Sequence, residues 1–246
     1  MKLAIINFSG NVGKSTIARH LLAPRIPGCE IIAVESINAG DGQPMTIRGR
    51  QFAHLQEYLH TVDDVVVDVG ASNVEDLLAL MRRYSGSHMD FDGFIVPTVP
   101  ARKQQQDTAA TLAELARIGV SAQRIRLVFN QIEDDTPLED VFHTLLAFCA
   151  TSGHVQPRMG AFLGFNEVYA RVRGTDRTLA QLAADPTDYK RAIAKAASTD
   201  EKMAIGQALA TRRLALGVIP ELDACFAALD LQSLERHPSW PATVTA

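Results

Sequence analysis

The segment that follows the first apolar run constrains the fold of this chain most strongly. It reads Asn-Phe-Ser-Gly-Asn-Val-Gly-Lys-Ser-Thr over residues 7–16, between apolar residues 3–6, typical of a buried strand, and residues 17–22, typical of a helix. A strand, a glycine-containing loop, Gly-Lys-Ser and a helix form the arrangement of a phosphate-binding P-loop. The usual pattern has one more glycine, at the position of Phe8.

The residue types of this segment fit phosphate chemistry. Backbone N–H groups of such a loop and of the helix start point at phosphates. Lys14 would place a positive charge on the phosphates and serve as a catalytic group, while the Ser15 hydroxyl would bind Mg²⁺. The alternative is an ordinary turn between strand and helix with a solvated lysine. The predicted nucleotide-binding residues of the loop are Ser9, Gly10, Asn11, Val12, Gly13, Lys14, Ser15 and Thr16.

Short runs rich in valine and isoleucine alternate with amphipathic stretches. This alternation predicts an α/β protein of the P-loop NTPase type, with a mostly parallel twisted sheet and helices on both faces. The predicted strands are 2–7, 30–35, 63–69, 92–98, 124–130 and, more weakly, 156–163. The predicted helices are 14–23, 45–60, 73–84, 101–118 and 137–151.

The character of the sequence changes near residue 165, where strand patterns end. Residues 1–165 are predicted to form the nucleotide-binding domain, residues 166–236 a helical C-terminal extension packed on it, and residues 237–246 a flexible tail. The predicted helices of the extension are 167–173, 178–184, 188–197, 200–216 and 220–231. Its basic residues are interspersed with acidic ones, which favours a solvated face; weak non-specific contact with DNA is the alternative.

Composition sets further limits on function. The chain of 246 residues has a formal net charge of −4, which argues against a uniformly basic nucleic-acid binder. Cys29, Cys149 and Cys225 are far apart and form no Cys-x-x-Cys motif, so we expect neither a local zinc site nor a redox motif. No apolar run is long enough to predict a transmembrane helix, and we expect a cytoplasmic protein.

A second acidic motif accompanies the P-loop. Residues 63–68 read Asp-Asp-Val-Val-Val-Asp, which predicts a strand ending at Asp68. Ligands bind at the carboxyl ends of strands in open α/β sheets, so Asp68 would hold Mg²⁺ there. Alternatively, Asp68 caps the following helix. The small residues Gly70, Ala71 and Ser72 would let the backbone approach a terminal phosphate.

Two more strand ends point toward the same edge. Glu35, Asn38 and Asp41 follow the second strand and are candidates to orient an attacking water; a polar turn is equally compatible with each. Asn130 ends the fifth predicted strand, where its amide would contact the base. The run Asn-Gln-x-Glu weakly resembles the guanine-reading element of GTPases but lacks its lysine, so adenine is favoured and guanine stays open.

With these motifs in order, the chain resembles the ParA/MinD family of P-loop ATPases over residues 1–165. The resemblance rests on residues 7–16, 64–72, 93–100 and 127–130, and the first segment is most similar to plasmid-stability proteins of the StbB type. It implies an ATP- and Mg²⁺-dependent switch in plasmid segregation and conjugation, acting as a homodimer or through a plasmid-encoded DNA-binding partner. Ser9 and Ile37 stand where the family has a lysine and an aspartate, so we expect a weak ATPase.

Three functional hypotheses follow from these features. The first is a nucleotide-dependent switch ATPase. The second is a nucleotide-binding adaptor with negligible hydrolysis, and the third is a metabolic P-loop enzyme. The third would need a separate acceptor site with convergent charges, which the sequence pattern does not show. Phosphate release with and without DNA and a partner separates the first two.

Overall fold

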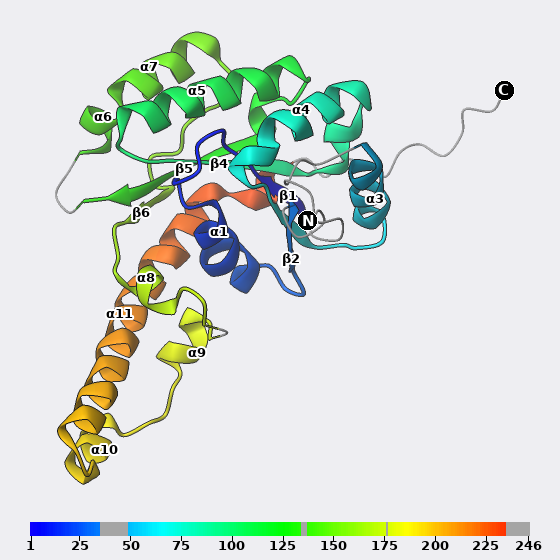
Figure 1. Cartoon of the computed structure of the whole chain (residues 1–246). Coiled ribbons are helices and arrows are strands. Elements are labelled where there is room, and N and C mark those ends of the chain that lie inside the picture. The colour runs from blue at the N-terminus through cyan, green and yellow to red at the C-terminus, as the bar shows by residue number, and fades with distance from the viewer. Residues whose placement is uncertain (35–48, 134–136, 176, 235–246) are drawn as a thin grey trace.

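A parallel six-stranded sheet forms the centre of the molecule (Figure 1). The computed structural model describes residues 1–34, 49–133, 137–175 and 177–234. The strand order is β2-β3-β1-β4-β5-β6, and every neighbouring pair is parallel. The strands are β1 (Lys2–Ile5), β2 (Glu30–Ala33), β3 (Val65–Asp68), β4 (Gly93–Thr98), β5 (Ile125–Ile132) and β6 (Phe162–Gly164). The predicted α/β P-loop NTPase fold is confirmed; the last strand is shorter and later than predicted.

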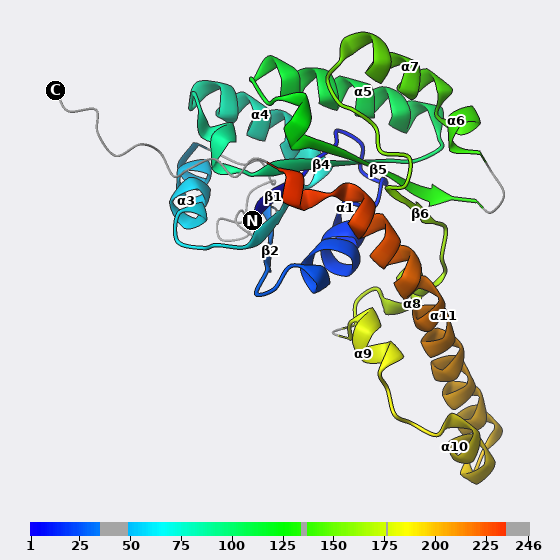
Figure 2. The ribbon, with the colours of Figure 1, turned by 180° about the vertical axis from the view of Figure 1, so that it is seen from behind.

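Helices cover both faces of the sheet (Figures 1 and 2). One face carries α3 (Gly49–Leu59), α4 (Val74–Arg83), α5 (Arg102–Arg117), α6 (Leu138–Val141) and α7 (His143–Ser152). The P-loop helix lies on the other face; it begins as α1 (Lys14–Thr16) and continues as a π-helical segment (Ile17–Leu22) and a 3₁₀ turn (Ala23–Arg25). That face also carries α8 (Val168–Val172), α9 (Leu179–Ala183) and part of α11 (Thr199–Leu229), whose first turns pack on α10 (Tyr189–Lys195).

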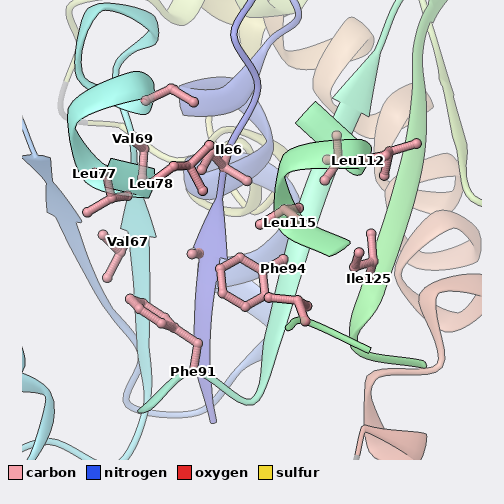
Figure 3. Close-up of a cluster of buried hydrophobic side chains, with 14 of the residues drawn as sticks. Ile6, Val67, Val69, Leu77, Leu78, Phe91, Phe94, Leu112, Leu115 and Ile125 are labelled. Carbon is pink, nitrogen blue, oxygen red and sulfur yellow. The ribbon is translucent and has the colours of Figure 1, made fainter. Parts of the chain in front are cut away.

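The hydrophobic core is split by the sheet into two parts. Figure 3 shows the first part, where Phe91 and Phe94 pack among valines of β3 and leucines of α4 and α5. The second part joins Ile17 and Leu21 of the P-loop helix to Leu222 of α11. The central strands are buried on both faces, which explains why their sequences are continuous apolar runs instead of alternating patterns.

The helix predicted over 137–151 is interrupted. It consists of α6 and α7, which meet at Phe142, where the backbone leaves helical geometry (φ −105°, ψ 15°). The Phe142 side chain is fully buried and its ring lies 4.8 Å from that of Phe129. Tertiary packing of one aromatic side chain therefore outweighs local helical periodicity.

The two helices predicted over 200–216 and 220–231 are one continuous helix, α11, with Pro220 in its interior. Proline removes a backbone donor and normally ends a helix. Here the buried positions recur on one face on both sides of the proline, at Ala215, Val218, Leu222, Cys225 and Leu229. This spacing keeps one apolar stripe against the core, and packing of that stripe favours the uninterrupted helix.

The C-terminal helices have two different environments. Residues 215–229 of α11 belong to the core beside the P-loop helix, and Arg25 pairs with Asp223 across that contact at 2.6 Å. The helical arm, defined as α10 and residues 199–213 of α11, projects away from the sheet (Figure 2). The proposed division into domains at residues 165 and 236 stays a prediction. The described residues contain no helix that is both long and apolar enough to cross a membrane.

Candidate functional site

The side chain of Asn7 holds the start of the P-loop in place. The Asn7 Nδ2 group donates to the Pro97 carbonyl (2.8 Å) and the Thr108 hydroxyl (2.9 Å), and its Oδ1 accepts from the Ser9 amide (2.7 Å). The Phe8 amide donates to the Thr111 hydroxyl (3.1 Å). Both polar atoms of the fully buried Asn7 side chain are therefore used: Nδ2 joins the start of the loop to β4 and α5, and Oδ1 accepts a hydrogen bond within the loop.

The end of the loop requires a glycine. Gly13 has φ 87°, in the left-handed region that disfavours side chains, and its carbonyl accepts from the Ile17 amide (2.9 Å) at the start of the helix. A Cβ atom at this position would lie 2.2 Å from the Asn130 Nδ2 atom. That nitrogen donates to the Val12 carbonyl (3.0 Å), so the Asn130 side chain fixes the loop at Val12.

Lys14 is buried within the loop that it follows. Its side chain is among the buried residues, at 5% exposure, and its Nζ donates to the carbonyls of Asn7 (3.1 Å) and Ser9 (2.7 Å). A lysine whose charge is held against the loop backbone is placed for a phosphate, since it is partly desolvated and its charge attracts an anion strongly. The burial of Lys14 does not agree with the alternative of an ordinary turn between strand and helix with a solvated lysine.

A cavity of about 630 Å³ opens in front of the P-loop, a size typical of small-molecule sites. It lies where the strand order reverses around β1, the usual ligand position in open α/β sheets. Its described lining residues come from the P-loop, from the ends of β2, β3 and β5, and from the segment after α8. They are Gly10, Asn11, Gly13, Lys14, Ser15, Thr16, Ala33, Asp68, Gly70, Ala71, Ser72, Gln131 and Arg173.

Asp68 and Ser15 line the cavity from two different elements, the end of β3 and the P-loop helix. Asp68 is the last residue of β3, paired in register with Ile5 of β1, and is 9% exposed. Ser15 lies one residue into the P-loop helix. A carboxylate and a hydroxyl are oxygen ligands of the kind that Mg²⁺ prefers, so the donor set fits this ion. The geometry places both donors on the same cavity as Lys14.

The structure brings together part of the predicted site. Gly10, Asn11, Gly13, Lys14, Ser15, Thr16 and Asp68 line the cavity. Val12 is buried and accepts a hydrogen bond from Asn130 through its carbonyl; neither residue lines the cavity, and Ser9 contributes its carbonyl to Lys14. Contact of Asn130 with a base stays a prediction. Glu35, Asn38 and Asp41 lie outside the described residues.

Two polar cavity residues were missed by sequence reasoning. Gln131 follows Asn130, has φ 59°, and lines the cavity where Asn130 does not. Positive φ is uncommon for a residue with a side chain and marks a constrained position. Arg173 comes from the C-terminal segment, where it is one of several basic residues with no motif around it. Only the tertiary arrangement identifies it.

The comparisons with known proteins do not assign a family. No protein-family model matches the sequence, and neither does a curated protein. Solved structures that are similar to it include apo McdA of Cyanothece, at 13% identity and TM-score 0.49, covering 84% of this chain and 98% of that one. Another is a Cyanothece McdA variant in complex with ATP, at 14% identity and TM-score 0.45, covering 85% and 96%. At such identities and TM-scores, the similarity carries no conclusion on activity.

Proposed function

We propose that the chain is a ParA/MinD-like, nucleotide-dependent switch that binds Mg²⁺–ATP and hydrolyses it slowly. The observation that carries this proposal is the buried Lys14, held by loop carbonyls at the wall of a cavity that Ser15 and Asp68 also line. The three residue types in one cavity match the needs of a triphosphate with its metal. An ordinary turn between a strand and a helix would not require these three residue types to line one cavity.

Different residues are proposed to bind the phosphates, the metal ion and the base. Backbone N–H groups of residues 10–15 and Lys14 hold the phosphates, and Ser15 and Asp68 hold Mg²⁺. When bound, the metal neutralises charge that develops on the phosphates. Asn130 and the neighbouring Gln131 are the proposed contacts to an adenine base. Lys14 stabilises charge on the phosphates during hydrolysis, and Glu35, Asn38 and Asp41 are proposed to orient the water.

The contacts of Asn7 support the switch. Asn7 joins the P-loop directly to the Pro97 carbonyl and to Thr108 of α5. The segment from Pro97 to Lys103 links β4 to α5 and is the proposed partner surface. If binding of a terminal phosphate shifts the P-loop, the hydrogen bonds of Asn7 would transmit that shift directly to the partner surface. Residues Gly70–Ser72, which also line the cavity, would contact a terminal phosphate as well.

The biological role belongs to the same proposal. We assign the switch to plasmid segregation or stability and to conjugation, in the cytoplasm, with a plasmid-encoded DNA-binding protein as partner. A nucleotide-dependent homodimer and weak direct contact with DNA are further states that the same switch would control. The resemblance to StbB-type proteins supports this assignment.

Association measured in defined nucleotide states tests the switch. Sedimentation of the chain, alone and with the DNA-binding protein encoded next to it, is compared in ADP and in a non-hydrolysable ATP analogue, with saturation verified. The switch predicts different association in the two states. Identical profiles would leave a passive adaptor, and brisk phosphate release that needs a small-molecule acceptor would favour a metabolic enzyme.

A further inference from the structure

A second cation enters the cavity from a part of the chain far from the P-loop. Arg173 lines the cavity together with Lys14, although more than half of the chain separates them in sequence. These two are the cationic side chains among the described lining residues. Arg173 follows α8, which ends at Val172, at the base of the helical arm.

A defined turn presents Arg173 to the cavity. Arg173 has φ −59° and ψ 128°, and Gly174 has φ 76°. The Thr175 amide donates to the Val172 carbonyl at 3.1 Å, and the Thr175 hydroxyl donates to the same carbonyl at 2.8 Å. These values describe a type II β-turn, in which the third residue requires a positive φ and is usually glycine. Arg173 is therefore held by local geometry.

The base of this turn is anchored beside the P-loop helix. Val172 and Val168 are buried in the same core part as Ile17 and Leu21. The rings of Tyr169 in α8 and His20 in the P-loop helix lie 5.7 Å apart. The backbone that carries Arg173 is thus packed against the P-loop helix, which holds the arginine at a defined position relative to the P-loop.

Arg173 differs from the arginines around it in its partners. Arg171 pairs with Glu167 at 3.2 Å, and Arg177 pairs with Asp185 at 2.7 Å. Within the described part of the chain, Arg173 forms neither an ion pair nor a side-chain hydrogen bond. A guanidinium without such a partner at the wall of a cavity is available to an anion.

We propose that Arg173 is a phosphate-binding residue that the C-terminal segment adds to the P-loop site. This inference rests on the nucleotide binding proposed above. A triphosphate with its Mg²⁺ remains anionic, and the planar guanidinium binds phosphate oxygens through two parallel hydrogen bonds. The described lining contains no aromatic side chain that would stack on a base. The described lining residues therefore favour the phosphate chain, and not the base, as the partner of Arg173.

Calorimetric titration with Mg²⁺–ATP and with Mg²⁺–tripolyphosphate tests this role. The parent chain is compared with Arg173→Ala and with Arg171→Ala, a matched control for an exposed arginine that does not line the cavity. Arg173→Ala should weaken binding of both probes about tenfold or more, because charge-assisted hydrogen bonds are lost. Arg171→Ala should leave both affinities unchanged, and thermal unfolding of the two variants without nucleotide should coincide.

The outcomes separate this inference from the proposed function. If the parent chain binds neither probe, the nucleotide site itself is wrong. If the parent binds and Arg173→Ala binds both probes as tightly as Arg171→Ala does, Arg173 has no role. A loss with ATP but not with tripolyphosphate would assign Arg173 to the sugar or base and overturn the phosphate role.

A second variant tests the turn. Gly174→Ala keeps the arginine, and a Cβ atom at this position meets no atom within 4 Å. The positive φ is nevertheless unfavourable for alanine, so the turn that presents Arg173 should distort. We expect weaker binding of tripolyphosphate in the same direction as for Arg173→Ala. Parent-like affinity in Gly174→Ala would show that the turn does not position the arginine.

Discussion

Asp68 and Asp64 lie near opposite ends of one strand. Asp68 is the last residue of β3, at the cavity, whereas Asp64 directly precedes β3 and pairs with the N-terminal amine at 2.5 Å. Only the first position can serve a metal bound in the cavity. The two residues therefore separate a role in metal binding from a general effect of removing a carboxylate near this strand.

We expect Asp68→Asn to remove most of the Mg²⁺ dependence of ATP binding. An amide is a weaker ligand than a carboxylate, so the loss of metal affinity should be at least as large as the roughly 10–100-fold that follows removal of a group that only positions a ligand. ATP affinity is measured by calorimetry with Mg²⁺ and with a chelator, with Asp64→Asn as control. A parent-like ratio of the two affinities in Asp68→Asn would contradict the metal role, and a loss of melting temperature without nucleotide would support the capping alternative.

We expect His20 to make the stability of the folded chain depend on pH. Burial, with a smaller contribution from the charge of Arg19, lowers the pKa of His20 from 6.5 to about 4. Between these values the unfolded chain binds a proton that the folded chain does not, so stability falls as pH decreases from 6.5 toward 4. One such proton changes the unfolding free energy by at most about 1.4 kcal/mol per pH unit.

Urea unfolding at several pH values from 4.5 to 7 measures this effect. His20→Leu has no titrating ring and should show a shallower loss of stability on acidification than the parent chain. Carboxylates contribute equally to both proteins, so the difference between the two profiles isolates His20. Parallel profiles would show that His20 titrates alike in the folded and unfolded states.

At the scale of elements, α11 is the main departure from sequence reasoning. Pro220 predicts an end, yet the apolar stripe continues through it, since burial of the stripe against the P-loop helix offsets the lost hydrogen bond. Phe142 has the opposite effect, because burial of its ring breaks a helix that periodicity predicts. Both departures come from contacts between distant segments, which local patterns do not contain.

The end of α11 is capped by a residue of β5. The buried Arg126 donates through Nε to the Leu229 carbonyl (2.7 Å) and through Nη2 to the Ser233 hydroxyl (2.8 Å). Burial lowers the pKa of this guanidinium, which remains charged because its starting value is very high. A cation at a helix C-terminus satisfies carbonyls that lack partners within the helix.

We expect Arg126→Met to lower the unfolding free energy by about 1–3 kcal/mol, because buried carbonyls lose their donors. Denaturant unfolding measures the change. The control is Arg117→Met, in an exposed pair with Glu114, which should change stability by less than about 1 kcal/mol. Equal effects of the two variants would show that capping by Arg126 contributes no more than a surface ion pair.

For the whole molecule, the parallel sheet was predictable because its central strands, β1, β3, β4 and β5, are apolar runs that are almost entirely buried, although the edge strands β2 and β6 are partly exposed. The positions of Lys14, Ser15 and Asp68 were predictable for a related reason, since the carboxyl ends of parallel strands share one edge. Arg173 was not, because it reaches the cavity only after α8 packs beside the P-loop helix. Gln131 was missed because its constrained backbone has no signature in composition.

Binding of Mg²⁺–ATP by the parent chain and by Lys14→Ala tests the proposed nucleotide site at the P-loop. The control is Lys190→Ala, which removes an exposed lysine of α10 away from the cavity. In isothermal titration calorimetry we expect the parent and Lys190→Ala to bind with equal affinity. Lys14→Ala should bind at least about 30-fold more weakly, since the phosphates lose a charge partner. Equal affinity of Lys14→Ala and the parent, or no binding by the parent, would contradict a nucleotide site at the P-loop.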